Sequence, residues 1–406
     1  MDNITHTLAG VMVAEGLHHY RLRRGHQLPA AWAPVAMATS VFTGNAPDLD
    51  LIYSGNQLAY LMHHRGITHT LIAVPVLALA GLVFPLLWIR FRRLDFYRQD
   101  HLWLGLLALA GGLLHILLDF GNVYGVHPFW PFDASWIYGD RIFIVEPWLW
   151  FSMLPCTLFL CRHRPVLRLL TGTLILLTTA LLLTVDLVSA VAAGLVISWG
   201  LILFALGSVT GPAQRLVTAL VAVVMVSTCF ILTGNRVEAM ARHHLAGGGN
   251  LHDLSLSPLP GNPFCWFVVS AETRGDQYIA RRAVVAPWPQ VLQATGCPPA
   301  PKGFAPLAKA TTTGADAYLL PVGVFRGTRA RFDRLLQDSC VARGAARFYR
   351  NPFWDEKAGI TGDLRFDNRR RAFANLRLND THLCPDAPVP WTPPRQDIFP
   401  GLRPGR

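Results

Sequence analysis

Charged side chains are scarce in this 406-residue sequence. Asp, Glu, Lys and Arg make up 15% of it, whereas hydrophobic residues make up 52%. A soluble globular chain usually carries about 25% charged residues, so the deficit indicates a membrane protein. The formal net charge is +11. Because much of this charge is Arg beside apolar segments, as membrane topology requires, we expect no nucleic-acid partner.

A cleavable signal peptide is also missing. The first twenty residues carry Asp2, His6 and Glu15, which do not suit the apolar core of such a peptide. We therefore expect these residues to be part of the mature protein.

Cysteine is sparse, and its distribution is informative. Of the seven cysteines, three lie in or beside apolar segments. The other four lie in the polar C-terminal third and are Cys265, Cys297, Cys340 and Cys384. Four widely spaced cysteines favour two disulfides and an oxidising compartment, with four reduced structural cysteines as the alternative. The spacing does not say which cysteine pairs with which.

Apolar runs of membrane length, about 20 residues, occur only before residue 235. They are 71–89, 102–120, 169–185, 191–209 and 216–232. We interpret the shorter apolar runs, at 4–17, 30–43 and 148–160, as half-depth helices packed beside the spans. Basic clusters at 21–24, 90–98, 162–168 and Arg215 are all cytoplasmic in the simplest topology, which places the chain from about Asn235 outside.

The polar C-terminal third has a mixed pattern with a strand bias. Residues 265–270, 278–287 and 317–325 are rich in β-branched and aromatic residues, and 329–344 has helical spacing. The fold class we predict is mainly α: a polytopic membrane domain followed by a mixed α/β extracytoplasmic domain. The predicted boundaries are a metal-dependent hydrolase domain at 1–162, three further membrane helices at 163–234 and the external domain at 235–406.

Four short motifs in the first 150 residues combine His and Asp. They are Asp2–His6 (DNITH), Pro47–Asp50 (PDLD), His63–His69 (HHRGITH) and His115–Asp119 (HILLD). The last pair is four residues apart and shares one face of a helix, where an imidazole and a carboxylate can grip one ion. Asp48 and Asp50 face the same way if their loop is extended. His64 and His69 flank an Arg-Gly pair, whose glycine we expect to allow a sharp turn.

The predicted topology brings all four motifs to the outer membrane face. Ionisable residues in membrane segments are costly and are functional by default, so we predict a metal site there. Ligands that are all His and Asp suit Zn²⁺, Mn²⁺ or Fe, with Zn²⁺ as our first choice. Several carboxylates together favour two or three ions over one. Such a site can polarise a phosphoryl oxygen and generate hydroxide at neutral pH.

Two further residues have competing interpretations. Arg65 either forms a salt bridge with Asp48 or Asp50 or clamps a substrate phosphate. Glu146 either adds a ligand or general base or caps the helix that follows it.

These motifs, with Tyr124-Gly125 and Trp130-Pro131-Phe132, resemble those of the YdjM-like inner-membrane metal-dependent hydrolases. The resemblance covers about residues 1–150. It implies a fold similar to that of zinc-dependent phospholipase C and the related single-strand nucleases, which are mostly helical and hold zinc ions with His, Asp, Glu and the N-terminal amine. Family members often have Asp-Pro after the WPF segment, whereas this sequence has Glu146-Pro147.

The resemblance also implies a ligand set and an activity. The ligands it implies are His6, Asp48, His69, His115 and Asp119, with Asp50 and His64 as further candidates. The activity it implies is phosphoester hydrolysis.

We therefore expect a membrane-bound phosphoesterase that acts on a lipid head group or a periplasmic phosphoester. The candidate catalytic residues are Asp48, Asp50, Arg65 and Glu146. The expected location is the bacterial inner membrane, with the site and the C-terminal domain on the periplasmic side. One alternative is a non-catalytic membrane protein with a structural metal and a partner-binding external domain. Another is a metal or proton transporter, which would need carboxylates at mid-membrane depth rather than at one edge.

Overall fold

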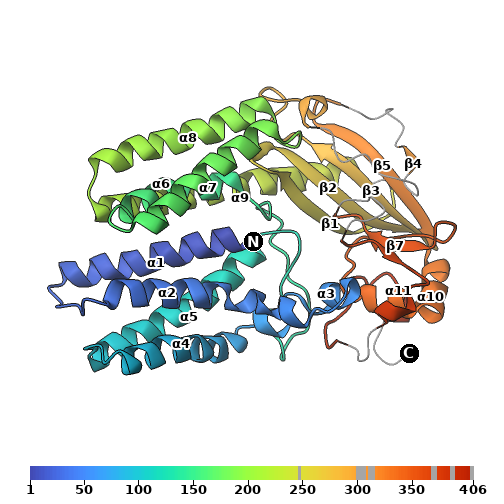
Figure 1. The fold of residues 1–406 in the computed structure, drawn as a ribbon. Coiled ribbons are helices and arrows are strands. Elements are labelled where there is room, and N and C mark those ends of the chain that lie inside the picture. The colour runs from blue at the N-terminus through green and yellow to red at the C-terminus, as the bar shows by residue number, and fades with distance from the viewer. Residues whose placement is uncertain (246–247, 299–307, 310–315, 367–372, 385–388, 403–406) are drawn as a thin grey trace.

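The computed structural model of the protein describes residues 1–245, 248–298, 308–309, 316–366, 373–384 and 389–402. A bundle of long helices stands beside a region of β-sheet and short helices (Figure 1). This arrangement confirms the mainly helical class with a C-terminal region that contains β-sheet.

The bundle consists of two layers of helices that lie side by side (Figure 1). The first layer holds α1 (Asn3–Arg23), α2 (Trp32–Asn45), α4 (Ala73–Phe91) and α5 (Arg98–Phe120). The second holds α6 (Pro147–Leu160), α7 (Pro165–Thr184), α8 (Ala190–Val209) and α9 (Pro212–Leu245). Five helices, α4, α5, α7, α8 and α9, are long and apolar enough to cross a membrane. These five coincide with the five predicted spans, so the prediction of a multi-pass membrane protein is confirmed.

Short elements connect the first layer to the C-terminal region. They are the 3₁₀ helix η1 (Ala46–Tyr53), α3 (Gln57–His63) and the 3₁₀ helix η2 (Ile67–His69). They lie at the end of the bundle that faces the β-sheets (Figure 1).

The C-terminal region holds two antiparallel sheets. The larger has the strand order β1-β2-β3-β5-β4, and the smaller has β6-β7-β8. The strands are β1 (Asn250–Leu259), β2 (Asn262–Arg274), β3 (Gln277–Val285), β4 (Ala308–Lys309), β5 (Leu319–Thr328), β6 (Pro352–Asp355), β7 (Ile360–Asp363) and β8 (Leu376–Arg377). The three predicted strands correspond to β2, β3 and β5, whereas β1 and the smaller sheet were not predicted. The predicted helix at 329–344 is present as α10 (Arg329–Asp338) and α11 (Cys340–Ala345).

Helix α9 carries the chain from the bundle into the β-sheet region. It continues past Gly234, where the composition changes, to Leu245. Val237, Ala241 and Leu245 are buried in a core shared with Trp266 and other sheet residues. Their spacing of four residues keeps them on one helix face, so packing against the sheet extends the helix beyond its apolar segment.

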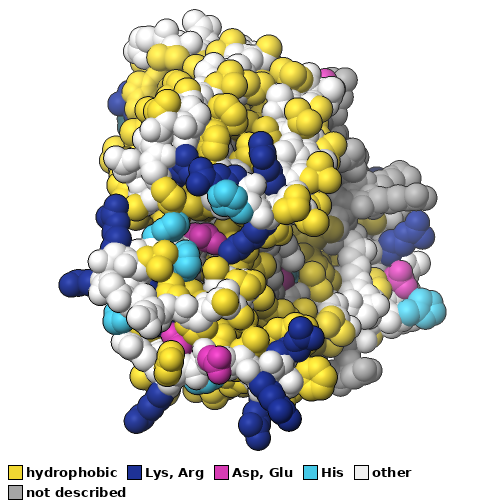
Figure 2. Space-filling model, turned by 60° about the vertical axis from the view of Figure 1, so that its left-hand side comes forward, with side chains coloured by type: hydrophobic (Ala, Val, Ile, Leu, Met, Phe, Trp, Pro, Cys, Tyr) yellow, Lys and Arg dark blue, Asp and Glu magenta, His cyan; other side chains and the backbone are white. Residues whose placement is uncertain are grey.

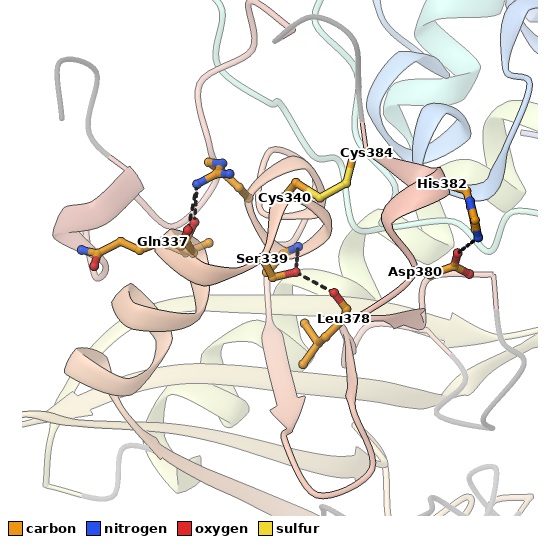
Figure 3. The surroundings of a disulfide bond; sticks show 10 residues. Gln337, Ser339, Cys340, Leu378, Asp380, His382 and Cys384 are labelled. Carbon is orange, nitrogen blue, oxygen red and sulfur yellow. Dashed lines mark hydrogen bonds and ion pairs between the residues drawn. A yellow bond between two sulfur atoms is a disulfide. The ribbon is translucent and has the colours of Figure 1, made fainter.

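Two disulfides stabilise the C-terminal region, as the cysteine pattern predicted. Cys265 pairs with Cys297, and Cys340 pairs with Cys384, with Cα–Cα distances of 5.8 and 5.5 Å. Figure 3 shows the second bond, which joins the start of α11 to the segment after the 3₁₀ turn η4 (Thr381–Leu383). Closing such loops restricts the unfolded chain.

The C-terminal region forms hydrogen bonds and apolar contacts with the short elements that follow α2 and α5. The Trp391 indole Nε1 donates to the Met62 carbonyl at 2.7 Å, and the Arg365 Nη1 donates to the Val123 carbonyl at 2.9 Å. One hydrophobic cluster contains residues from both parts of the chain, among them Leu58 and Phe348. The parts of the chain before and after the predicted boundary at residue 235 therefore pack together and share a hydrophobic core.

The basic clusters lie at the far end of the bundle from the β-sheets. Helix α1 ends in Arg21–Arg23, α4 ends after Arg90, and α5 begins at Arg98. Figure 2 shows Lys and Arg side chains around this end of the helices. The basic end and the sheet end of the bundle are thus opposite, which agrees with the separation that the sequence predicted.

Candidate metal centre

The first motif starts helix α1. The Asp2 carboxylate accepts hydrogen bonds from the backbone N–H groups of Ile4 and Thr5, both at 3.0 Å, and so caps the helix. Because the cap fixes the first turn, His6 is held inside the bundle, where it is 2% exposed.

The second motif forms the 3₁₀ helix η1, not the extended loop that we predicted for Asp48 and Asp50. Pro47 lies in its first turn, where the fixed φ of proline suits helical geometry. Both carboxylates are buried, but they make different contacts. Asp48 faces the Nε2 atoms of His69 and His115, whereas Asp50 faces His64 and the Nδ1 of His69.

The third motif turns sharply at Arg65, which has a φ of 62°, and not at the glycine that we expected. Gly66 has an ordinary negative φ. It is required for a different reason, because a Cβ at this position would come within 2.6 Å of the Trp391 ring and 2.7 Å of the His63 carbonyl. Trp391 of the C-terminal region therefore packs directly against the turn between His64 and His69.

The fourth motif lies on the last turns of α5, where His115 and Asp119 share one face as predicted. The Nδ1 of His115 lies 2.7 Å from the Gly44 carbonyl oxygen at the end of α2. Its ring also stacks on His6, with 3.8 Å between ring centroids. Both contacts fix the direction of the His115 ring.

Four of these side chains form what we call the deep group. It consists of Asp48, His69, His115 and Asp119, all buried, each offering one ligand atom within 4.8 Å of the others. The two Nε2 atoms of His69 and His115 are 3.0 Å apart. The His69 Nε2 is 3.2 Å from Asp119 and 3.4 Å from Asp48, and the His115 Nε2 is 3.5 Å from each carboxylate.

The proton positions show why the deep group fits a cation. A carbonyl oxygen can only accept, so the Nδ1 of His115 carries the proton and its Nε2 presents a lone pair. The Nδ1 of His69 lies 3.0 Å from the Thr68 hydroxyl oxygen and 3.4 Å from the Asp50 carboxylate. Because the Thr68 hydroxyl donates to Asp50, both neighbours can accept from this Nδ1, which orients His69 in the same way. Two lone pairs and two carboxylates therefore converge. With ligand bonds of about 2.0–2.2 Å, the edges of a tetrahedral zinc site are about 3.3–3.6 Å, close to the distances found here.

A second set of ligand atoms, the rim group, consists of Asp48, Asp50 and His64. The Asp50 carboxylate lies 2.9 Å from the Nδ1 of His64 and accepts from the Arg65 backbone N–H at 2.9 Å and the Thr68 hydroxyl at 3.0 Å. Burial tends to raise the pKa of Asp50, but its hydrogen bonds with His64 and His69 outweigh this and hold the pKa well below its usual value. Asp50 is therefore ionised.

Asp48 belongs to both groups and links them. Burial again tends to raise its pKa, but hydrogen bonds with His115 and His69 hold the pKa far below its usual value. Asp48 and His64 are each 7% exposed, whereas His69 and Asp119 are fully buried. The rim group is thus the part of the centre nearest to solvent.

Asp119 is contacted by three further groups. The Nε2 of His6 lies 3.3 Å from Oδ1, the α-amino group of Met1 contacts the same oxygen, and the Nε of Arg65 lies 3.0 Å from Oδ2. His6, a predicted ligand, therefore lies beside the deep group through Asp119. The sequence did not assign Met1 to the centre in this chain, although the start of α1 at Asn3 necessarily carries Met1 toward His6.

Arg65 is paired differently from our prediction. Its guanidinium binds Asp119, not Asp48 or Asp50, and also donates to the Asn122 side-chain oxygen at 3.0 Å. It lies over the Tyr124 ring, 4.7 Å from the centroid, and is 1% exposed. These contacts fix Arg65 in place as a support for Asp119.

Glu146 lies outside both ligand groups. Its carboxylate accepts from the Trp148 backbone N–H at 3.3 Å and caps helix α6, which is the structural role weighed for it. Burial raises the pKa of Glu146 to about 8, and hydrogen bonds from the backbone of Trp148 and Gly261 oppose the shift.

Trp391, in the C-terminal region, packs behind the centre, and no motif in the sequence pointed to it. Trp391 stacks on His127, with 4.2 Å between ring centroids, and the Nδ1 of His127 lies 3.1 Å from the Arg65 carbonyl oxygen. Trp391 lies hundreds of residues after Arg65 and His127 in the chain, so no local motif connects it with them.

The fold and the site together define a multi-pass membrane protein with buried His and Asp groups that could hold a metal ion. Residues 1–192 match the family model described as YdjM inner membrane protein, which confirms the family resemblance of the motifs. The matched segment contains every predicted ligand and ends within α8.

Similarity to a curated protein is limited to part of the chain. An uncharacterized protein, YfhP of Bacillus subtilis (strain 168), is 29% identical over 126 residues. The alignment covers 30% of this chain and 36% of that protein. No solved structure matches the chain, so the expected likeness to phospholipase C stays a prediction.

Proposed function

We propose that this protein is a membrane-bound, metal-dependent hydrolase that cleaves phosphoesters. The observation that carries the proposal is the deep group, in which the lone pairs of His69 and His115 converge on the carboxylates of Asp48 and Asp119. A buried set of this kind is strongly disfavoured without a cation. The all-His and Asp ligand set favours Zn²⁺, with Mn²⁺ or Fe as alternatives.

Two ligand groups that share Asp48 support more than one ion, since a shared carboxylate supplies negative charge to both. When bound, the metal would polarise the phosphoryl oxygen and lower the pKa of a water molecule. The protein's own residues hold the arrangement. Asp50 keeps the His69 ring oriented through its Nδ1, and Arg65 holds Asp119. In this proposal Arg65 is a positioning residue, Asp48 orients the attacking water, and the substrate enters at the rim group.

A lipid head group is the substrate class that the surroundings favour. Helix η1 carries the ligands Asp48 and Asp50 and exposes apolar side chains between and after them. These are Leu49 at 47%, Leu51 at 43%, Ile52 at 81% and Tyr53 at 55% exposure. Apolar side chains beside a polar site suit the head-group level of a bilayer.

We further propose that the centre lies on the periplasmic side of the inner membrane. The basic clusters are at the opposite end of the bundle, which suits the positive-inside rule. The two disulfides in the adjoining C-terminal region suit an oxidising compartment.

A structural metal site is the second candidate, and one observation favours it. The deep group supplies four protein ligands and is buried, as in closed structural zinc sites. This alternative predicts a bound metal without turnover. A transporter is less compatible, because the ligands lie at one end of the bundle.

The test uses the full-length protein purified in detergent and loaded with Zn²⁺ or Mn²⁺. Turnover of a chromogenic phosphodiester and of phospholipid in mixed micelles is measured together with metal content. We expect His69→Ala and Asp119→Asn to lose both metal and turnover, because each residue belongs to the deep group.

Matched controls are His101→Ala and Asp95→Asn, which make the same changes at exposed positions near the basic end. Both should keep metal and turnover. Unchanged turnover in His69→Ala and Asp119→Asn would refute the hydrolase. Metal binding with no turnover of either substrate by the wild-type protein would favour the structural site.

A further inference from the structure

A long apolar groove runs along the helices, apart from both ligand groups. It has a volume of about 470 Å³ and is bounded by α1, α5, α6 and α9. Side chains from each helix line it, including Met12, Leu118, Leu149 and Val217. This volume lies within the range of about 300–1,000 Å³ that is typical of ligand sites.

Polar side chains in the groove are confined to its two ends, and the ends differ. At the end near the metal centre, the Thr5 hydroxyl donates to Asp2 at 2.7 Å and accepts from the Trp150 indole at 2.9 Å. Thr5 is therefore fully engaged. At the basic end, the lining includes His19 and Arg23.

The basic end offers unused hydrogen-bond donors. Within the described part of the chain, Arg23 forms no ion pair, and it is exposed. His19 has one ionic contact, with Glu15 at a long 3.9 Å. Tyr20 also lines this end. Figure 2 shows Lys, Arg and His side chains around this end of the bundle. Positive charge at the mouth of an apolar groove complements an anionic head group.

We propose that this groove binds an anionic phospholipid, with its phosphate at Arg23 and His19 and one hydrocarbon chain along α1. The chain would extend toward Leu114 and Leu118, which directly precede the ligands His115 and Asp119. Both leucines also line, with His115, a small packing gap beside the groove. The bound lipid would therefore be a structural component of the protein that packs against the turn of α5 carrying His115 and Asp119. This proposal does not depend on hydrolase activity.

The groove can be filled by a single substitution. Gly16 lines it, and a Cβ at this position would meet no atom within 4 Å. Gly16→Leu therefore adds a side chain to the groove without a clash. Gly105→Leu is the matched control, because a Cβ at Gly105 also meets nothing within 4 Å and Gly105 does not line the groove.

The experiment is native mass spectrometry of the full-length protein in detergent. Phosphatidylglycerol and phosphatidylcholine with the same acyl chains are added in equal amounts. We expect the wild-type protein and Gly105→Leu to retain phosphatidylglycerol in preference, and Gly16→Leu to retain severalfold less of both lipids. Arg23→Gln should reduce the preference for phosphatidylglycerol about fivefold, since one Arg contributes about that factor at an anionic surface.

Two results would overturn the proposal. One is equal lipid retention by Gly16→Leu and Gly105→Leu, because the groove would then not be the binding site. The other is an unchanged preference in Arg23→Gln, a substitution at an exposed residue that leaves the helix core intact. Since neither readout depends on turnover, failure here is distinguishable from failure of the hydrolase proposal.

Discussion

Two buried sets of carboxylates in this protein have their charge compensated in different ways. Where the loop before α6 meets the C-terminal region, Asp140 and Asp253 share the guanidinium of Arg350 at 2.9 and 2.6 Å. Arg395 approaches Asp253 at 3.3 Å. Arg395 also pairs with the exposed Asp397 at 3.4 Å. Each carboxylate of this network therefore has a guanidinium partner within the protein.

At the candidate metal centre the balance is different. Three carboxylates, Asp48, Asp50 and Asp119, are accompanied by one guanidinium group, that of Arg65, and by the α-amino group of Met1, and both of these groups contact Asp119. The His69 and His115 imidazoles turn Nε2 lone pairs, rather than protons, toward the carboxylates of Asp48 and Asp119. A buried network that is closed by Arg is complete as it stands, whereas one with excess negative charge and free lone pairs needs a cation. The comparison therefore supports the proposal that the centre is a ligand set, whereas the Arg350 network is a structural one, although both are rich in Asp.

The largest effect is expected at the Arg350 network. Arg350→Met leaves Asp140 and Asp253 without their shared partner, and breaking a buried pair costs about 3–5 kcal/mol. Thermal unfolding of the purified protein should show this loss with and without added zinc. Arg329→Met is the control, because Arg329 forms an exposed pair with Asp276 at 3.8 Å that is worth less than about 1 kcal/mol. A smaller loss relative to the wild-type protein with zinc than without zinc would contradict the comparison.

At the metal centre, in contrast, we expect the stability of the protein to depend on zinc. Zinc at about 100 times its dissociation constant should stabilise the wild-type protein by about 2.7 kcal/mol relative to protein stripped with a chelator. Asp119→Asn should lose most of this stabilisation, because it removes a ligand of the deep group. Arg350→Met should keep it. The measurement is the melting temperature of each protein with zinc and with chelator.

A smaller effect, on metal affinity, is expected for Thr68, which contacts the ligand Asp50. The Thr68 hydroxyl donates to Asp50 at 3.0 Å, and Asp50 orients His69. Losing such a supporting contact typically lowers metal affinity by 10–100-fold, or about 1.4–2.7 kcal/mol. Thr68→Val should show this in competition with a zinc indicator. Ser54→Ala should not, since its hydroxyl binds the Asp50 backbone carbonyl at 3.2 Å rather than the carboxylate. Equal affinities for the two variants would refute the supporting role.

The sequence predicted the spans and the ligands because both are local signals. An apolar run marks a membrane helix wherever it packs, and His115 and Asp119 lie on one face by helical spacing alone. The site geometry was predicted less well where it depends on neighbours. With η1 as a 3₁₀ helix, Asp48 and Asp50 contact opposite nitrogens of the His69 ring, and spacing could not show this.

Other features depend on residues far apart in the sequence. Gly66 was expected to supply the turn, but it is needed because Trp391 packs against it. Arg65 was expected either to pair with Asp48 or Asp50 or to clamp a substrate phosphate, but it pairs with Asp119 on α5. In both cases the contacting residue belongs to another element, so no pattern in the motif itself could show it.

Glu146 represents a third way to compensate a buried carboxylate, which is to bind a proton. It has neither an Arg partner nor a ligand set, and burial raises its pKa to about 8 from an ordinary value of 4.5. Between these values the folded protein holds a proton that the unfolded chain has released. The free energy of unfolding should therefore fall by about 1.4 kcal/mol for each pH unit across this interval and should not change further above pH 8 on account of Glu146.

Glu146→Gln mimics the protonated acid, so it should unfold like the wild-type protein near pH 4.5 and become progressively more stable than it up to pH 8. Thermal unfolding of both proteins across this range measures the difference, and Glu356→Gln, at an exposed ion pair with Arg331, is the control. A constant difference between Glu146→Gln and the wild-type protein would mean that Glu146 is ionised when buried and that a cation, not a proton, balances it.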